Sequence, residues 1–416
     1  MLSPADNELL TSIVPGTPMG ELYRRFWLPV LQSSEIAEPD GPQIRLKILG
    51  EELIAFRDSE GRVGLVEAYC KHRRAPLFFG RNEKCGLRCV FHGWKYDVTG
   101  QCVDLPNAAE GESIKHLVKL TAYPTKEHGG LVWAYMGPIG KEPPFPYFPW
   151  FEVPETHRHL ARLTARCNWF QVMEADVDSS HLSFLHSRVD ETDNKGLDVR
   201  LKPNLMKSRF VHWDTRDTDY GIRIAARRDV DEATNYWRIN HFLLPYCVVI
   251  AGPPDHPMVV QIRVPMDDTN TLHFRVYAHL DRPLTAEERD LSGNMFPELD
   301  PATGRMKETI ENDYLMDRVR QKRETFTGIQ SVVAQDLAVT EFQGGPISDR
   351  SMEFLTSSDG AIVAVRRRLI EAAKALAAGK EPPEAQVPEA YRVRGTQFTL
   401  PKDLDVEVGL RKMAAE

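Results

Sequence analysis

The sequence predicts an α+β protein of two unequal domains, with a small antiparallel β domain first and a larger, helix-covered antiparallel sheet behind it. Three observations lead to this prediction. The chain has 416 residues, which is enough for two or three domains that each bury a core. Short strand-like runs come first, and a proline-rich segment follows them. The rest of the chain is a run of strands bracketed by helix-like segments, which favours α+β over a parallel doubly wound sheet.

The first part of the chain is predicted to be rich in β-strands. Residues 43–70 contain the runs IRLKIL, LIAF and VGLVEAY, which are separated by turns that contain Gly and Asp. Short apolar runs at this spacing are typical of a small antiparallel barrel or sandwich. The strand-like run LVWAYMG closes this region at Gly137.

A proline-rich segment separates the two domains. Six prolines fall within residues 138–154, and they forbid a regular helix or a central strand there. We therefore predict a β domain with an N-terminal helical segment at 1–140, a linker at 141–155, and a second domain at 156–416.

Beyond the linker the hydrophobic pattern changes. Residues 169–187, 305–342 and 361–378 have helix-like apolar spacing, whereas residues 205–280 hold several strand-like runs. We expect helices that cover one antiparallel sheet.

Composition excludes several functional classes. The chain has 52 Lys+Arg against 60 Asp+Glu, and its net charge of −8 disfavours binding to a polyanion such as nucleic acid. The longest apolar stretch, 242–251, is far shorter than the about 20 residues that span a bilayer. The N-terminus does not look like a secretory signal. We expect a cytoplasmic protein without membrane spans, in which the six cysteines are ligands or buried thiols rather than disulfides.

Two short pairs of metal-binding residues stand out in the first domain. They are Cys70 with His72 and Cys89 with His92, and 16 residues separate the pairs. A zinc finger usually presents its two cysteines together and its two histidines together, whereas here each loop offers one of each. This order suits a two-iron cluster in which thiolates hold one iron and imidazoles hold the other.

The flanks of these pairs, CKHRRAPL from Cys70 and GLRCVFHGWKYD from Gly86, resemble the Rieske iron–sulfur motif. The resemblance implies a Rieske [2Fe-2S] cluster on the four residues. A zinc-stabilised binding protein without redox chemistry is the alternative from a different class, and colour separates the two because a Rieske protein is red-brown. The other four cysteines are interpreted as bystanders: Cys85, Cys102, Cys167 and Cys247.

A second cluster of metal-binding residues follows the linker, in the pattern Asp178-x-x-His181-x-x-x-x-His186. Asp178 and His181 share a helix face. His181 and His186 are about 140° apart on an ideal helix, so both bind one metal only if the helix is bulged or broken. Two imidazoles and a distant carboxylate form the facial triad of non-haem iron(II) oxygenases. Taken alone, the pair would be interpreted as core histidines.

After a Rieske motif, this pattern resembles the catalytic (alpha) subunit of Rieske non-haem iron oxygenases over nearly the full chain. The matched segment begins at Asn168. The resemblance implies a catalytic domain with an SRPBCC (Bet v1-like) sheet and a mononuclear Fe(II) held by His181 and His186. It also implies a catalytic role for Asp178, as a bridging carboxylate between metal centres, and for Asn168.

The third iron ligand implied by the resemblance is a carboxylate on a late helix. Asp336 stands alone among Val, Ala and Leu, where a buried carboxylate needs a partner that a metal would supply. Glu341 and Asp349 are the alternatives, and each is equally explained as a solvated charge at a helix end.

Three further segments resemble the phthalate dioxygenase branch of the family: GTPMGELYRRFW from Gly16, QDLAVTEFQGGPISDR from Gln335 and LTSSD from Leu355. This branch includes ring dihydroxylases of aromatic acids and oxidative demethylases of lignin-derived methoxyarenes.

The resemblance also implies partners. We expect a homotrimer, or stacked trimers, in which His92 of one chain hydrogen-bonds Asp178 of the next. A reductase or ferredoxin must supply electrons, and O2 is a substrate. Basic side chains around the first motif are candidates for docking an acidic donor, or are plain surface charges. They are Lys71, Arg73, Arg74, Arg81, Lys84, Arg88 and Lys95.

The substrate is predicted from the strand-rich part of the second domain. An arginine can bind a carboxylate through two parallel hydrogen bonds, and Arg223 and Arg238 have the most apolar neighbours among the strand arginines. The others are Arg209, Arg227 and Arg228. Met173, Val177 and Phe184 could wall an aromatic ring, although core packing explains them as well.

These predictions together describe the terminal oxygenase of a multicomponent Rieske system that acts on a carboxylated aromatic compound. Our hypothesis leans to oxidative O-demethylation of a lignin-derived methoxyarene, such as a dehydrodivanillate-type biaryl, with release of formaldehyde. Phthalate-type cis-dihydroxylation of an aromatic ring requires the same metals and is the close alternative.

Overall fold

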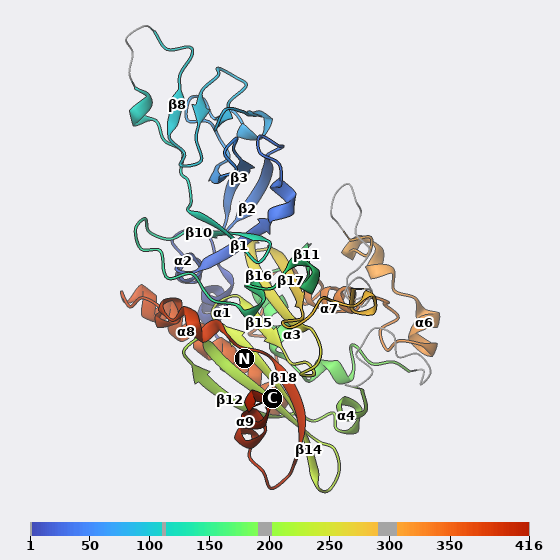
Figure 1. The fold of residues 1–416 in the computed structure, drawn as a ribbon. Helices are drawn as coiled ribbons and strands as arrows, with labels where there is room; N and C mark the ends of the chain where they lie inside the picture. The colour runs from blue at the N-terminus through green and yellow to red at the C-terminus, as the bar shows by residue number, and fades with distance from the viewer. Residues whose placement is uncertain (1, 110–113, 190–201, 290–305, 416) are drawn as a thin grey trace.

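The computed structural model describes residues 2–109, 114–189, 202–289 and 306–415. Figure 1 shows a small β lobe, coloured blue to cyan, that projects from a larger body built on one extended sheet. Antiparallel strands form every described sheet, and helices cover the larger one, so the predicted α+β class is confirmed. None of the helices in the described ranges combines the length and the apolar character that crossing a bilayer requires.

The small lobe contains three short sheets. In strand order they are β1-β10-β9, β2-β3-β4 and β5-β6-β7-β8. The strands are β1 Trp27–Gln32, β2 Ile44–Ile48, β3 Glu51–Arg57, β4 Val63–Glu67, β5 Arg81–Asn82, β6 Leu87–Arg88, β7 Lys95–Tyr96, β8 Cys102–Asp104, β9 Thr125–His128 and β10 Leu131–Tyr135.

The larger body is an eight-stranded antiparallel sheet in the order β11-β17-β16-β15-β14-β13-β12, with β18 paired to β14. Its strands are β11 Arg158–Ala165, β12 His212–Thr218, β13 Gly221–Asp229, β14 Thr234–Leu243, β15 Cys247–Ile250, β16 Met258–Asp267, β17 Asn270–Ala278 and β18 Thr396–Pro401. Six of these strands fall in or next to the stretch 205–280, where the sequence predicts strands.

The helices lie around this sheet. They are α1 Pro4–Thr11, α2 Pro18–Arg24, α3 Trp169–Val177, α4 Lys202–Lys207, α6 Arg318–Arg323, α7 Val332–Glu341, α8 Gly360–Ala377 and α9 Val406–Ala415. The stretch 305–342 is not one helix, because the 3-10 turn Ile310–Leu315 and the loop before α7 interrupt it. α1 and α2 pack against α8, so the N-terminal segment that we grouped with the β lobe shares its packing with the larger body.

Strand register defines two faces of the large sheet. Side chains alternate along a strand, and directly paired residues point to the same face. Arg263 of β16 forms an ion pair with Asp176 of α3 at 2.7 Å, so its face, here called the inner face, is the one that α3 covers. The register puts buried polar residues on that face: Arg228, Arg238, Gln261, His273 and Arg275.

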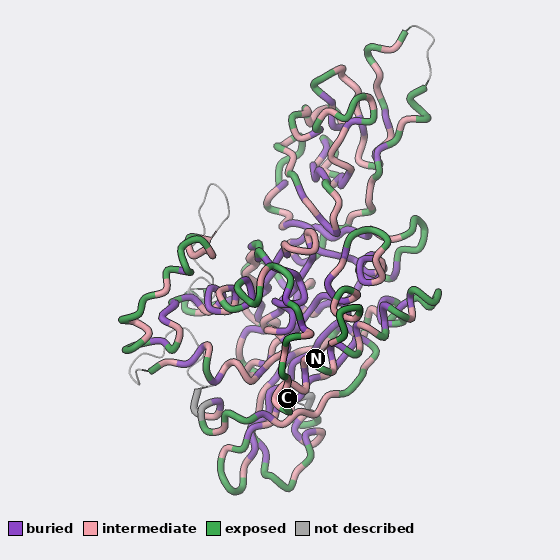
Figure 2. The backbone as a smooth tube through the Cα atoms, turned by 180° about the vertical axis from the view of Figure 1, so that it is seen from behind, coloured by how far each residue is buried: buried purple, intermediate pink, exposed green. Residues whose placement is uncertain are grey.

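The proline-rich connection holds no α-helix or strand and contains one 3-10 turn, Pro149–Phe151. It lies against β10, where Phe145, Phe148 and Trp150 surround Trp133 with ring centroids 5.7–6.4 Å apart. The backbone coloured by burial in Figure 2 shows buried segments that continue from the body into the base of the lobe. The main hydrophobic core accordingly includes residues from both, whereas the tip of the lobe has a small core of its own.

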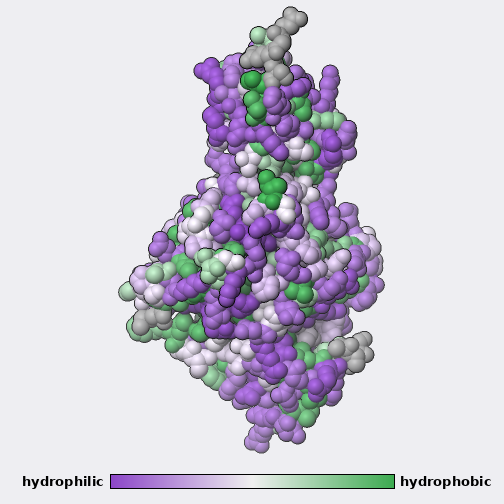
Figure 3. Space-filling view, turned by 90° about the vertical axis from the view of Figure 1, so that its left-hand side faces the viewer, coloured by the Kyte–Doolittle hydropathy of each residue, from purple (hydrophilic) through white to green (hydrophobic). Residues whose placement is uncertain are grey.

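The lobe and the body are joined directly at β2 and β16. Leu49 and Gly50 donate backbone hydrogen bonds to the carbonyls of Pro265 and Met266, at 2.9 and 2.8 Å. Beside them Lys47 pairs with Asp267 at 2.7 Å. The face of the molecule in Figure 3 is hydrophilic over most of its area, with hydrophobic side chains in small separate patches.

Candidate functional site

The tip of the small lobe brings the first two residue pairs together. Cys70 and His72 follow β4, and Cys89 and His92 follow β6, so two neighbouring loops face each other. The imidazole rings of His72 and His92 lie 4.4 Å apart by their centroids. Both cysteines are buried, at 1% and 2% exposure. The structure thus places two thiols and two imidazoles in one cluster, as the spacing predicts.

Each loop is a tight turn closed by its own backbone. Arg74 N–H donates to the carbonyl of Cys70, and Gly93 N–H donates to the carbonyl of Cys89, both at 2.9 Å. Gly93 has a φ of +80°, which a side chain would strain. These turns fix the ligand side chains without help from the larger body.

The donor set fits a Rieske cluster. The Nδ1 atom of His72 is buried and has no hydrogen-bond partner among the described residues, which leaves it available to a metal. The indole of Trp94 stacks on the His72 ring at 4.5 Å, and the Tyr96 hydroxyl lies 3.2 Å from the Cys70 sulfur. Desolvation, together with the nearby His72 and Arg73, lowers the pKa of His92, which favours the neutral imidazole that a metal requires.

The second site lies where α3 ends. The helix stops at Val177, and Asp178 accepts hydrogen bonds from the backbone N–H groups of Ser180 and His181 at 2.7 and 3.0 Å. A short 3-10 turn, His181–Ser183, then carries the chain to His186. Two histidines five residues apart can converge only because the helix is broken here, as the spacing requires.

His181, His186 and Asp336 form one candidate metal centre. Their ligand atoms all lie within 4.8 Å of one another. The Asp336 Oδ1 atom is 3.1 Å from His186 Nε2 and 3.9 Å from His181 Nε2. This oxygen is buried and has no hydrogen-bond partner among the described residues, so it suits a metal placed between the three side chains. Two imidazoles and one carboxylate match the facial triad of iron(II) sites.

Nearby groups keep the carboxylates at this centre ionised, and the ionised form is the one that can bind a metal. Burial alone would raise the pKa of Asp336, but His186 and His181 outweigh it and lower that pKa. Burial likewise opposes ionisation of Asp178, whose pKa is lowered by its hydrogen bond to His181. Both carboxylates are therefore ionised at neutral pH.

The other candidates for the third ligand lie elsewhere. Glu341 accepts a hydrogen bond from Arg166 N–H at 2.7 Å, and the Tyr314 hydroxyl also bonds to it. Asp349 is held by Ser351. Among the three acids, only Asp336 joins the two histidines in a described metal-binding group.

Asn168 has a different role from the predicted catalytic one. Its Oδ1 accepts from Phe170 N–H, which caps α3, and its Nδ2 donates to the carbonyls of Thr11 and Asp268 at 2.9 and 2.7 Å. The side chain is completely buried. Because its hydrogen-bonding groups hold backbone, we correct its role to anchoring the start of α3.

Arg223 is also corrected. It pairs with His241 across β13 and β14, on the outer face of the sheet, and forms an ion pair with Glu407 of α9 at 2.7 Å. α3 covers the opposite face, so Arg223 does not point toward the metal centre. Arg238 does lie on the inner face. Arg228, a less favoured candidate for substrate binding, lies on the same face.

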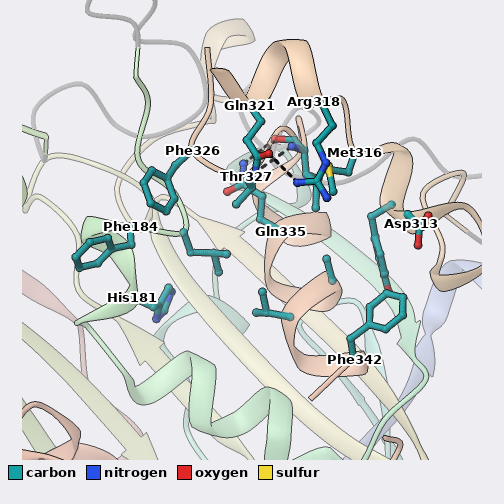
Figure 4. Close-up of a pocket in the computed structure, with 15 residues that line it drawn as sticks. His181, Phe184, Asp313, Met316, Arg318, Gln321, Phe326, Thr327, Gln335 and Phe342 are labelled. Carbon is teal, nitrogen blue, oxygen red and sulfur yellow. Dashed lines mark hydrogen bonds between the residues drawn. The ribbon is translucent and has the colours of Figure 1, made fainter. Parts of the chain in front are cut away.

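Met173 and Val177 are completely buried in the main core, where packing accounts for them. Phe184 is 41% exposed and lines a cavity of about 670 Å³ beside His181. Figure 4 shows Phe184 and Phe326 on the His181 side of this cavity, with Gln335 of α7 near its centre.

One site residue, Gln335, was not singled out from the sequence, and another, Arg228, was ranked below Arg223 and Arg238. Gln335 lies 2.7 Å from His186 Nδ1, and its only sequence signal was its place directly before Asp336. Arg228 is completely buried and donates to the Ser179 carbonyl and hydroxyl, in the turn between Asp178 and His181. Side chains alternate between the two faces along β13. Once the face covered by α3 is known, this alternation identifies Arg228.

Comparisons with known proteins agree with this geometry. Residues 26–124 match the Rieske [2Fe-2S] domain, and residues 134–410 match the LigXa C-terminal domain-like family. The phthalate 4,5-dioxygenase oxygenase subunit of Pseudomonas putida is 37% identical, over 97% of this chain and 94% of its own. The 5,5'-dehydrodivanillate O-demethylase oxygenase subunit of Sphingobium sp. is 31% identical, over 92% and 83%. The crystal structure of dicamba monooxygenase bound to dicamba has a TM-score of 0.60 at 18% identity, and covers 86% of this chain and 99% of that chain.

Proposed function

Because the chain belongs to the Rieske non-haem iron oxygenases, as their oxygenase (alpha) subunit, we propose that it oxygenates a carboxylated aromatic compound. The observation that carries this proposal is the pairing, in one chain, of a two-cysteine, two-histidine cluster with a two-histidine, one-carboxylate centre. The cofactors are a Rieske [2Fe-2S] cluster and a mononuclear iron.

We assign the cluster to Cys70, His72, Cys89 and His92, and the single iron to His181, His186 and Asp336. When bound, the two metal centres deliver electrons and activate O2. The protein's own part is to orient the imidazoles. Asp178 Oδ2 lies 3.2 Å from His181 Nδ1, so the carboxylate holds this ring with its Nε2 toward Asp336.

We expect electron transfer to cross between subunits of a homotrimer. Asp178 is the bridging carboxylate in this proposal, and it accepts a hydrogen bond from His92 of the next chain. Support comes from the exposure around the cluster: Val90 and Phe91, beside His92, are 58% and 54% exposed on this single chain. A neighbouring subunit would cover them.

A reductase or ferredoxin supplies the electrons in this proposal. Of the basic side chains near the cluster, Arg88 pairs with Glu83 and Asp104, and Lys71 pairs with Glu67. Arg73 and Arg74 are exposed and lie over the rings of Phe91 and Tyr69. Arg74 is the better candidate for an acidic donor, because Arg73 lies over Phe91, which the neighbouring subunit would cover. Reduction by that donor should slow as ionic strength rises.

Two buried arginines support a carboxylated substrate. Arg228 and Arg238 are 0% and 4% exposed on the inner face, and the Nε atom of each has no hydrogen-bond partner in the part of the chain that the structure describes. Among the described residues neither forms an ion pair with an acid. A buried guanidinium without an anion is costly, and a substrate carboxylate would provide that anion. Burial and the nearby Arg238 lower the pKa of Arg228 to about 10, so it remains charged at neutral pH.

Two reactions fit this site. The higher identity to a phthalate dioxygenase subunit, over nearly the full chain, supports cis-dihydroxylation of an aromatic acid. The O-demethylase relative supports the sequence-based lean to O-demethylation, at lower identity. Both require the same metals and differ in which carbon of the substrate lies nearest the oxidant.

The test is to reconstitute the purified protein with a reductase and to supply aromatic acids with and without methoxy groups. Formaldehyde indicates O-demethylation, and a cis-diol indicates ring dihydroxylation. Turnover of neutral aromatics in preference to all of the acids would contradict the proposed substrate class.

A further inference from the structure

The two histidines of the candidate iron centre are held by different kinds of partner. His181 Nδ1 faces the carboxylate of Asp178 at 3.2 Å, whereas His186 Nδ1 lies 2.7 Å from Oε1 of Gln335. Both rings direct Nε2 toward Asp336. One imidazole therefore has an anionic partner, and the other has a neutral one.

The orientation of the Gln335 amide follows from its second contact. Gln335 Nε2 donates to the carbonyl of Ile329 at 2.9 Å. A carbonyl only accepts hydrogen bonds, so the NH2 group must face Ile329 and the amide oxygen must face His186. This oxygen only accepts as well. His186 must therefore carry its proton on Nδ1, which leaves Nε2 unprotonated and able to bind a metal.

Gln335 is held rigidly in place. It is 4% exposed in the first turns of α7, and the Ser331 side chain caps that helix by accepting from Ala334 N–H. The neighbouring residue, Asp336, supplies the carboxylate of the same centre. One helix thus delivers a ligand and, one residue earlier, the group that orients another ligand.

We infer that Gln335 is a positioning residue of the iron site, which fixes the tautomer and the ring orientation of His186. A neutral amide does this without adding a second negative charge beside the centre, so of the two histidines only His181 has a carboxylate on its Nδ1 atom. The inference rests on the assignment of His181, His186 and Asp336 as the iron ligands.

The experiment measures metal binding rather than turnover. Protein that retains its cluster but lacks the mononuclear metal is titrated anaerobically with Fe(II), and with Co(II) to read the visible ligand-field spectrum. Gln335→Met keeps the volume and removes the acceptor. We expect its Kd for Fe(II) to rise about 10- to 100-fold, with an altered Co(II) spectrum and an unchanged cluster absorption.

Gln335→Glu, protonated on the oxygen that faces the Ile329 carbonyl, keeps a donor to that carbonyl and an acceptor for His186 Nδ1. It should bind Fe(II) within about threefold of the native protein. Gln171 provides the matched control. It is 1% exposed on α3, donates to the Thr340 carbonyl and accepts from Ser348 N–H, but touches none of the three ligands. Gln171→Met should lower the melting temperature yet leave the Kd for Fe(II) within about twofold.

Three results would overturn the inference: a native Kd in Gln335→Met, a loss in Gln335→Glu as large as in Gln335→Met, or an equal loss in Gln171→Met. If Gln335→Met does not fold, Gln335→Asn carries the same expectation, because its amide is one methylene too short to reach. Asp336→Ala, titrated in parallel, separates this inference from its premise. Native Fe(II) binding by Asp336→Ala would refute the ligand assignment itself.

Discussion

The two metal-binding regions of this chain are built in opposite ways. The cluster site is local: its four ligands lie on two neighbouring turns of the small lobe, each closed by its own backbone hydrogen bond. The iron site is assembled from the segment after α3, which carries His181 and His186, and from α7, which carries Asp336. These two segments are far apart in the sequence and meet only through tertiary packing.

Because the two sites are built differently, we expect substitutions in the cluster loops and substitutions at the iron site to have different consequences. A substitution in a cluster loop acts on a unit that has its own small core. A substitution of an iron ligand, or of a group that contacts one, acts on a site that the tertiary packing of the main body brings together. Loss of the metal from one site should therefore leave the metal in the other site bound.

The largest effect is expected for Asp336→Ala. The variant loses the one carboxylate that faces both Nε2 atoms, so the single iron should leave and turnover should fall by about 10³-fold or more. The cluster should stay, with its visible absorption unchanged, because its ligands belong to a separate unit. Loss of the cluster colour in this variant would contradict the independence of the two sites.

The next effect is expected for Asp178→Asn. An amide oxygen can still accept from Ser180 N–H, so both metals should remain bound. The negative charge beside His181 disappears, and we expect turnover to fall about 100-fold or more because the proposed link between cluster and iron is lost. Metal content and rapid reduction of the cluster check the first part. Turnover near the native rate would remove the bridging role of Asp178.

A smaller effect should distinguish the two faces of the sheet. Arg238→Met removes an inner-face guanidinium, and we expect KM for an aromatic acid to rise about 10- to 100-fold, or about 1.4 to 2.8 kcal/mol. Arg223→Met is the matched control on the outer face, where Arg223 pairs with Glu407. It should change KM less than about twofold. Equal increases in the two variants would mean that the arginines act on stability and not on substrate binding.

The smallest effect is expected at the junction between the small lobe and the larger body, where Lys47 pairs with Asp267. Burial would raise the pKa of Asp267, but hydrogen bonds from Lys47 and Asn270 lower it to about 2. A lowered pKa stabilises the fold above the unfolded value of about 3.9 and stops doing so as the pH falls toward 2. Asp267→Asn should therefore cost about 1 kcal/mol at neutral pH, after allowance for solvent screening.

Thermal unfolding of the native protein and of Asp267→Asn at several pH values checks this sign. The difference in melting temperature should be constant from pH 8 to 5 and should shrink below about pH 4. A difference that grows as the pH falls would mean that the Lys47–Asp267 pair does not stabilise the junction between lobe and body.

The contrast between the sites also explains what could be predicted from the sequence. Cys70, His72, Cys89 and His92 are close in the chain, so their spacing alone indicates a shared centre. A bulge or break between His181 and His186 was predicted, because two histidines five residues apart need a distorted helix to converge. The helix in fact ends earlier, at Val177, so Asp178 and His181 do not share a helix face as expected. Asp336 was chosen because the resemblance implies a carboxylate on a late helix and because an isolated buried acid is costly. Spacing gives no information over that distance.

The errors have a physical cause in common. Arg223 and Arg228 lie on one strand but on opposite faces, and hydrophobic neighbours alone did not tell which face α3 covers. Asn168 was interpreted as catalytic from its place in a motif, whereas its side chain accepts from Phe170 N–H to cap α3 and donates to the distant carbonyls of Thr11 and Asp268. The tertiary fold determines which face of a strand is covered and which distant segments are in contact. Neither could be predicted from this one sequence.

The most direct test of the account is the iron and acid-labile sulfide content of anaerobically purified protein, read per chain. Two types of iron site in one polypeptide predict three iron atoms and two sulfides. Iron without sulfide, or zinc in place of iron, would contradict it.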